Sequence, residues 1–247
     1  MINIKNAAEI EIMRQSGKIL KDVLCLIEEN IKIGVATEFL DKLAYDYIKK
    51  AGGAPTFLNY NGYPKTLCCS VDEEVVHGIP SARKLEEGMI VGIDCGVFYK
   101  GFNTDAARTF AVGKITAQKQ KLMDVTKECF FKALAVIKEG VRLGDIGAAV
   151  QKHAESNGFS VVRAMTGHGI GRKLHEDPEV LNYGTEGTGL RLNSGTTIAV
   201  EPMINLGGYE IEMLKDGWTM AACDRKPSAH YENTVVILKE GAEMLTE

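Results

Sequence analysis

The sequence lacks long hydrophobic runs, CxxC cysteine pairs and any strong excess of one charge. Its wholly apolar runs, such as 133–137, are about five residues long, far below the ~20 that a membrane-spanning helix needs. The six cysteines lack metal-site spacing, and we expect buried packing thiols rather than bridges or a zinc knuckle. Lys and Arg number 29 against 33 Asp and Glu, which argues against a DNA-binding surface.

The N-terminal segment has no apolar core typical of a signal peptide, because Lys5, Glu9 and Glu11 interrupt it. We therefore expect a cytoplasmic protein without a membrane anchor. With 45% hydrophobic and 25% charged residues, the composition is that of an ordinary globular chain. No Pro-rich or Ser-rich linker or charge block divides it, so we expect a single domain over residues 1–247.

Apolar residues recur with helical spacing in four segments. Asn6 and Glu9 form the pattern of a capping box before a long helix that ends near residue 30. Thr37 is predicted to cap a second helix that Gly52 and Gly53 end. Two more helices are predicted over 117–138 and 145–156.

The two helix pairs resemble each other. The sequence before the second helix, 31–35, matches 137–141, which lies 106 residues later, and Gly52 then falls opposite Gly158. Such a duplication suggests two related halves, and ligand sites favour the interface between halves. β-like runs occupy 66–71, 89–98, 102–112, 196–200 and 231–238. We therefore expect an α+β fold with an antiparallel sheet covered by helices on one side.

The first candidate for chemistry is a hairpin that carries Asp94 and Asp105 around a Lys100-Gly101 turn. With a two-residue loop, Asp94 lies opposite Ala107 and both carboxylates project from one face. A three-residue loop would put them on opposite faces. Two ionised carboxylates close together on one face repel each other, so this arrangement predicts a bound cation. The alternative is a pair of solvated carboxylates without a ligand.

Three further candidates lie in the second half of the chain. A glycine-rich loop carries His168 and His175. Its glycines, at 167, 169 and 171, do not have the spacing of a dinucleotide-binding motif, because no glycine stands at the third position of that motif. Glu201 and Glu232 flank apolar strands, where glutamate is rare unless paired or bound to metal. Each could instead be an ordinary loop or edge residue.

Four carboxylates carry a charge of −4, which balances two divalent cations. Oxygen-rich ligands with one imidazole suit Mn(II), Fe(II) or Co(II) better than typical zinc sites, although zinc stays an alternative. Two such ions can share a bridging hydroxide that attacks a carbonyl. The pattern therefore predicts metal-assisted hydrolysis.

Several motifs, in order and spread over nearly the whole chain, resemble type I methionine aminopeptidase in its short bacterial form. They are the segments 74–80, 166–171, 174–178, 200–203 and 228–232, together with Asp94 and Asp105. The resemblance implies the two-halved pita-bread fold of the creatinase and aminopeptidase family, with a metal site between pseudo-symmetric halves. It also implies removal of N-terminal methionine when the second residue is small.

The resemblance also implies a role for each site residue. Asp94 would hold one metal ion, His168 and Glu201 the other, and Asp105 and Glu232 would bridge both. Glu201 would also shuttle a proton, while His77 and His175 would contact the scissile peptide group or the developing oxyanion. A pocket for the methionine side chain would comprise Phe57, Tyr60, Tyr63, Cys68, Leu174 and Trp218.

The chain departs from the family pattern at three positions, where it has His230, Asn233 and Asp72 in place of the more frequent Gln, His and Asn. We expect all three beside or at the rim of the site. As substrates the resemblance implies the N-terminal Met of peptides and nascent chains. It leaves open whether the protein associates with the ribosome, and we expect a monomer.

Three other interpretations compete with a methionine aminopeptidase. A proline-specific or creatinase-like peptidase normally carries a large N-terminal domain, but only about 70 residues precede the first motif here. A binding module that has lost catalysis would lack ligands, and all five are present. A mononuclear zinc hydrolase using His77, His168 and His175 would leave four carboxylates unexplained.

Overall fold

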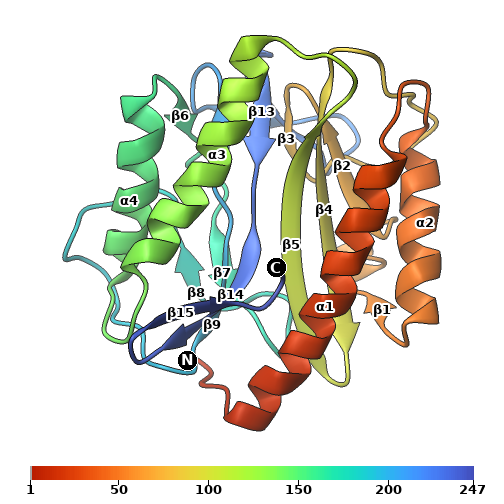
Figure 1. Ribbon diagram of the computed structural model, residues 1–247. Coiled ribbons are helices and arrows are strands. Elements are labelled where there is room, and N and C mark those ends of the chain that lie inside the picture. Colours follow the sequence, from red (N-terminus) through yellow and green to blue (C-terminus); the bar gives the residue numbers. More distant parts are fainter. Residues whose placement is uncertain (1) are drawn as a thin grey trace.

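The computed structural model describes residues 2–247 as an α+β fold (Figure 1). Its helices are α1 (Ala7–Asn30), α2 (Thr37–Lys50), α3 (Ala117–Val136) and α4 (Leu143–Ser156), with a short 3-10 helix η1 (Tyr60–Gly62). None of the helices in this range is long and apolar enough to cross a membrane.

The start of α1 follows the prediction, and the start of α2 does not. Asn6 Oδ1 accepts hydrogen bonds from the backbone of Ala8 and Glu9, and Glu9 accepts one from the Asn6 N–H, which completes the capping box. Thr37, predicted as the cap of α2, is instead its first residue. Its hydroxyl donates to the Ser81 carbonyl oxygen at 3.1 Å, so a contact with a distant loop replaces the local cap.

Within residues 2–247 the strands pair only in the antiparallel sense and form four small sheets. In the first sheet, β4 (Ile90–Tyr99) pairs with β1 (Ala54–Pro55), β2 (Leu67–Val71) and β5 (Phe102–Ala111). A five-stranded sheet has the order β15 (Gly241–Met244), β14 (Asn233–Leu238), β9 (Thr197–Val200), β7 (Gly167–Gly169) and β8 (Glu176–Val180). The other two sheets are β13 (Ser228–His230), β10 (Met203–Asn205), β6 (Ser160–Val161), and β11 (Ile211–Met213), β12 (Met220–Ala222), β3 (Glu74–Val76).

The predicted repeat is visible in the backbone of the two helix pairs. Gly34 and Gly140 turn the chain at φ +86° and +87°, which an L side chain rarely adopts. The Gly34 N–H donates to the carbonyl oxygen of Leu85 at 2.7 Å, and the Gly140 N–H donates to that of Leu192 at 2.8 Å. The same turn with the same long-range bond thus precedes α2 and α4, as expected for two related halves.

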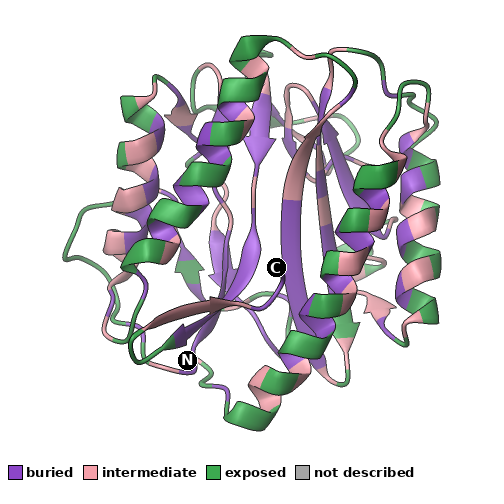
Figure 2. Cartoon of the chain, in the orientation of Figure 1, coloured by how far each residue is buried: buried purple, intermediate pink, exposed green. Residues whose placement is uncertain are grey.

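Both helix pairs cover the same side of the strands. In Figure 1, α1 and α3 lie across the front of the strands, with α2 and α4 beside them. Figure 2 shows that their buried faces turn toward the strands and their exposed faces outward. Each half has its own apolar core, one that includes Leu20 and Ile93, the other Phe130 and Val235.

The cysteine prediction is wrong for two residues. Cys25 and Cys223 are exposed, whereas Cys68, Cys69, Cys95 and Cys129 are buried, and all six are free thiols. The four buried thiols behave as small core side chains, as predicted.

Candidate metal centre and substrate cavity

The β4–β5 hairpin places Asp94 and Asp105 on one face of the sheet. Its loop has two residues, Lys100 and Gly101, at φ +47° and +91°, the positive values that a type I′ turn requires. Asp94 therefore pairs with Ala107, and Asp105 with Gly96. The prediction for a two-residue loop is confirmed.

The two halves of the molecule meet beside these residues. Asp105 N–H donates to the Thr234 hydroxyl oxygen at 2.8 Å, and that hydroxyl donates to the Asp105 carbonyl oxygen at 2.9 Å. The Glu232 N–H donates to the Ala107 carbonyl oxygen at 3.0 Å. These bonds join β5 to the chain at the start of β14, so Glu232 faces the two aspartates across the junction.

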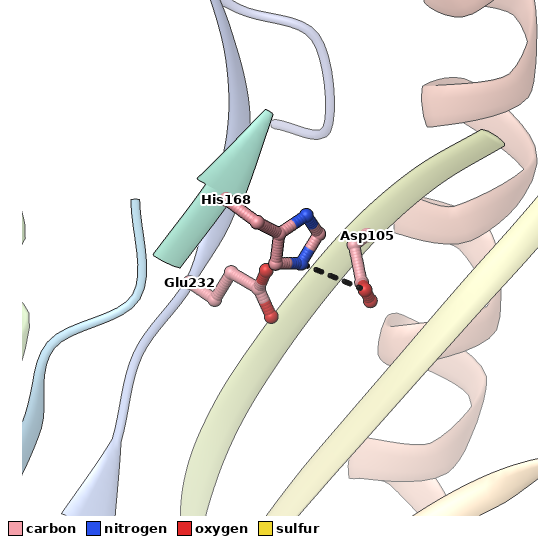
Figure 3. Close-up of side chains that lie close together, drawn as sticks. All are labelled: Asp105, His168 and Glu232. Atoms are coloured by element: carbon pink, nitrogen blue, oxygen red, sulfur yellow. Dashed lines mark ion pairs between the residues drawn. The ribbon is translucent and has the colours of Figure 1, made fainter. Parts of the chain in front are cut away.

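His168 enters the same space from β7. Its Nδ1 donates to the Gly169 carbonyl oxygen at 2.8 Å, which leaves the lone pair on Nε2 free. Burial lowers the pKa of His168 to about 3, so its imidazole is neutral near pH 7. Nε2 lies 3.7 Å from Glu201 Oε1 and 4.0 Å from Asp105 Oδ2. Figure 3 shows the imidazole between Asp105 and Glu232, and one potential ligand atom from each of these three residues lies within 4.8 Å of the others.

The carboxylates are too crowded to stay ionised without a cation. Burial raises the pKa of Asp94 to about 7. Burial and repulsion from the neighbouring carboxylates also raise the pKa of Asp105, Glu201 and Glu232 well above its usual range. Buried oxygens of Asp94, Asp105 and Glu232 have no hydrogen-bond partner within the described chain. Partnerless anionic oxygens facing a neutral imidazole nitrogen fit divalent cations with oxygen-rich coordination.

His77 and His175 lie beside this cluster. His77 follows β3 at φ +61°, a left-handed conformation that is uncommon outside glycine. The Tyr60 hydroxyl lies within hydrogen-bond distance, 2.9 Å, of His175 Nδ1. The rings of His175 and His168 meet edge to face, with their centroids 4.3 Å apart. Burial lowers the pKa of both His77 and His175, so each is neutral near pH 7 and can donate an N–H to an oxygen atom.

Every site residue predicted from the sequence lines one cavity of about 220 Å³. Phe57, Tyr60, Tyr63, Cys68, Leu174 and Trp218 line its apolar side. His77, His175 and the five candidate ligands, Asp94, Asp105, His168, Glu201 and Glu232, line its polar side. Sequence reasoning missed one lining residue, Asn61, whose only signal was its place between Tyr60 and Tyr63.

The three departures from the family pattern differ in their surroundings. His230 is buried, with Nε2 3.7 Å from Glu201 Oε2. Asn233 is also buried, and its Oδ1 accepts hydrogen bonds from Arg108 and Thr246. The expected position of Asp72 is wrong, because Asp72 does not line the cavity. Its carboxylate instead pairs with Lys119 and accepts a hydrogen bond from the Ile90 N–H at the start of β4.

Comparisons with known proteins agree with this architecture. Residues 11–239 match Metallopeptidase family M24. A methionine aminopeptidase of Clostridium perfringens is 50% identical over 100% of this chain and 99% of its own length. Crystal structures of methionine aminopeptidases from Thermotoga maritima and Rickettsia prowazekii are 43% and 41% identical, with TM-scores of 0.98 and 0.99 over 100% of both chains. From this full-length likeness, the chain belongs to metallopeptidase family M24 and, within it, to the methionine aminopeptidases.

Proposed function

We propose that this chain acts as a single catalytic domain that removes N-terminal methionine from peptides and nascent chains when the second residue is small. One observation carries the proposal: an apolar cavity ends at a cluster of buried carboxylates and imidazoles. At about 220 Å³, the cavity is smaller than the ~300–1,000 Å³ typical of ligand pockets. It therefore favours one side chain followed by a small residue.

The proposed metal centre has two ions, because the four carboxylates carry −4. Asp94 would hold one ion, His168 and Glu201 the other, and Asp105 and Glu232 would bridge them. Bound there, the ions would supply Lewis-acid activation of water and of the substrate carbonyl. The oxygen-rich ligands favour Mn(II), Fe(II) or Co(II), with zinc as the alternative.

Three residues would carry the proton and charge changes of the reaction. Glu201 accepts a proton from the attacking water and returns it to the leaving amine. His77 and His175 are neutral donors on the cavity wall, and they stabilise the negative charge that develops on the peptide oxygen. The Tyr60 hydroxyl at 2.9 Å holds the ring of His175 in place.

The apolar side of the cavity would select methionine. The rings of Tyr63 and Trp218 meet edge to face at 5.1 Å and, with Phe57, form an aromatic wall. A thioether against such rings gains roughly 0.3–1.5 kcal/mol for each sulfur–aromatic contact. A shorter side chain such as Ala would leave this space unfilled.

The test compares Met-Ala-Ser with Ala-Ala-Ser before and after chelation. We expect cleavage of Met-Ala-Ser only, its loss with chelator, and its return with Mn(II), Fe(II) or Co(II). Metal per chain at full activity should approach two. Full activity in metal-stripped protein would contradict the metal centre, equal cleavage of both peptides would contradict the methionine pocket, and one zinc per chain would favour the three-histidine site.

A further inference from the structure

His230 lies between two of the proposed metal ligands. Its side chain is 3% exposed, and its backbone is held by Thr109, whose hydroxyl accepts from the His230 N–H and donates to the His230 carbonyl oxygen, both at 2.9 Å. Pairing with Met203 on β10 fixes the strand further. The direction of the imidazole is therefore set by the sheet rather than by a flexible loop.

The ring of His230 lies close to the same carboxylates as His168. Its Nε2 lies 3.7 Å from Glu201 Oε2 and 4.0 Å from Glu232 Oε2, and has no hydrogen-bond partner within the described chain. His168 Nε2 lies 3.7 Å from Glu201 Oε1. The two oxygens of Glu201 are thus divided between two imidazoles.

We propose that His230 is a positioning residue of the metal centre, whose Nε2–H orients the Glu201 carboxylate through Oε2 and leaves Glu201 Oε1, on the side of His168, for metal. This inference rests on the proposed metal centre. The three ligand atoms that gather within 4.8 Å belong to Asp105, His168 and Glu232, so His230 stands outside that group. An N–H beside a ligating carboxylate fixes its orientation and raises metal affinity.

The distances allow this role without rearrangement of the sheet. Both distances from His230 Nε2 to the carboxylate oxygens exceed the length of a hydrogen bond, which is about 3 Å. A carboxylate shift of about 1 Å would therefore be enough to form one. The frequent family residue, glutamine, also offers an N–H at this position. A donor is therefore the property that the two side chains share.

The experiment replaces the donor and measures metal binding in the purified full chain. His230→Met substitutes a linear side chain without an N–H, and His230→Gln substitutes one that carries an N–H. His153→Met makes the same change on α4, where His153 pairs with Glu128 away from the centre. The readouts are the Co(II) dissociation constant from calorimetry and the visible Co(II) spectrum at saturation, with folding checked by circular dichroism.

We expect His230→Met to weaken Co(II) binding by about 10–100-fold, with an unchanged spectrum at saturation. His230→Gln should bind Co(II) much more tightly than His230→Met, because it retains a donor, and His153→Met should match the parent. Should the His230→Met chain not fold, His230→Asn takes its place, because its amide falls short of Glu201.

Two results would overturn the assignment. Parent-like affinity in the donor-free variant would remove His230 from the centre. A changed Co(II) spectrum that His230→Gln does not restore would make His230 a ligand itself. If the parent binds Co(II) but does not cleave Met-Ala-Ser, the proposed function fails while the comparison of affinities still decides the role of His230.

Discussion

Removing the positive charge of Lys5 should destabilise this protein far more than removing a surface lysine. Lys5 Nζ lies 2.6 Å from Glu176 Oε2, and the two side chains are only 4% and 3% exposed. Lys5 Nζ also donates to the Asn3 carbonyl oxygen at 3.1 Å, and Glu176 Oε1 accepts from the Lys173 N–H at 3.1 Å. The pair ties the N-terminal segment to the loop that carries His175.

Lys5→Met leaves the Glu176 carboxylate buried without its counter-charge. Breaking a buried pair in this way costs about 3–5 kcal/mol. At roughly 2–4 °C per kcal/mol for a chain of this size, the melting temperature should fall by about 6–20 °C. Lys42→Met is the matched control: its pair with Asp46 is 73% and 55% exposed, so its loss should cost at most about 1 kcal/mol.

Adding Glu176→Gln to Lys5→Met should restore most of the lost stability, because no buried charge then remains. Glu176 follows His175, so the single variant should also lower kcat/KM for Met-Ala-Ser. A displacement of about 1 Å at a catalytic group can cost on the order of 100-fold. Urea unfolding and peptide turnover, measured on the three variants beside the parent, give both values.

The effect should depend on pH with a defined sign. Burial raises the pKa of Glu176, but the hydrogen bonds from Lys5 and Lys173 and the charge of Lys5 outweigh it and hold the pKa below its usual value near 4.5. A carboxyl group with a lowered pKa contributes stability that is present above its unfolded pKa and is lost as the pH falls. The gap between parent and Lys5→Met should therefore be full near pH 7 and shrink on acidification, because protonation of Glu176 removes both the pairing in the parent and the unpaired buried charge in the variant. A Lys5→Met variant as stable as Lys42→Met, or a double variant as unstable as the single one, would refute the reasoning.

Three further outcomes are expected. Asp105→Ala should lose metal and activity together, whereas His77→Ala should keep its metal and lose about 10²–10³ in kcat; metal loss in His77→Ala would favour a three-histidine site. Peptides that begin Met-Lys should be poor substrates beside Met-Ala, and comparable kcat/KM values would contradict a closed site. Tyr60→Phe removes the 2.9 Å contact to His175 and should lower kcat about 2–12-fold, the value of one neutral hydrogen bond; an unchanged kcat would show that packing alone orients the ring.

Short-range patterns predicted the elements well, because their causes are local. The capping box of Asn6 and Glu9 depends on residues three apart, and the two-residue Lys100-Gly101 turn depends on positive φ. That turn sets the register of the hairpin, and the register places Asp94 and Asp105 on one face. The prediction that Thr37 caps a helix was wrong for the converse reason, because its hydroxyl donates to a carbonyl oxygen 44 residues away.

The sequence by itself determined the helices, the hairpin, the repeat and, through its resemblance to a known family, which residues to examine. Only the tertiary structure decided how they meet. Asp105 faces Glu232 because Thr234, 129 residues away, accepts from the Asp105 N–H, and His168 presents Nε2 because Gly169 accepts from Nδ1. The tertiary structure also decides that His230 lies close to Glu201 and that Asp72 pairs with Lys119 outside the cavity. No local periodicity encodes such contacts, because they arise only when strands from the two halves pair and bury their charges together.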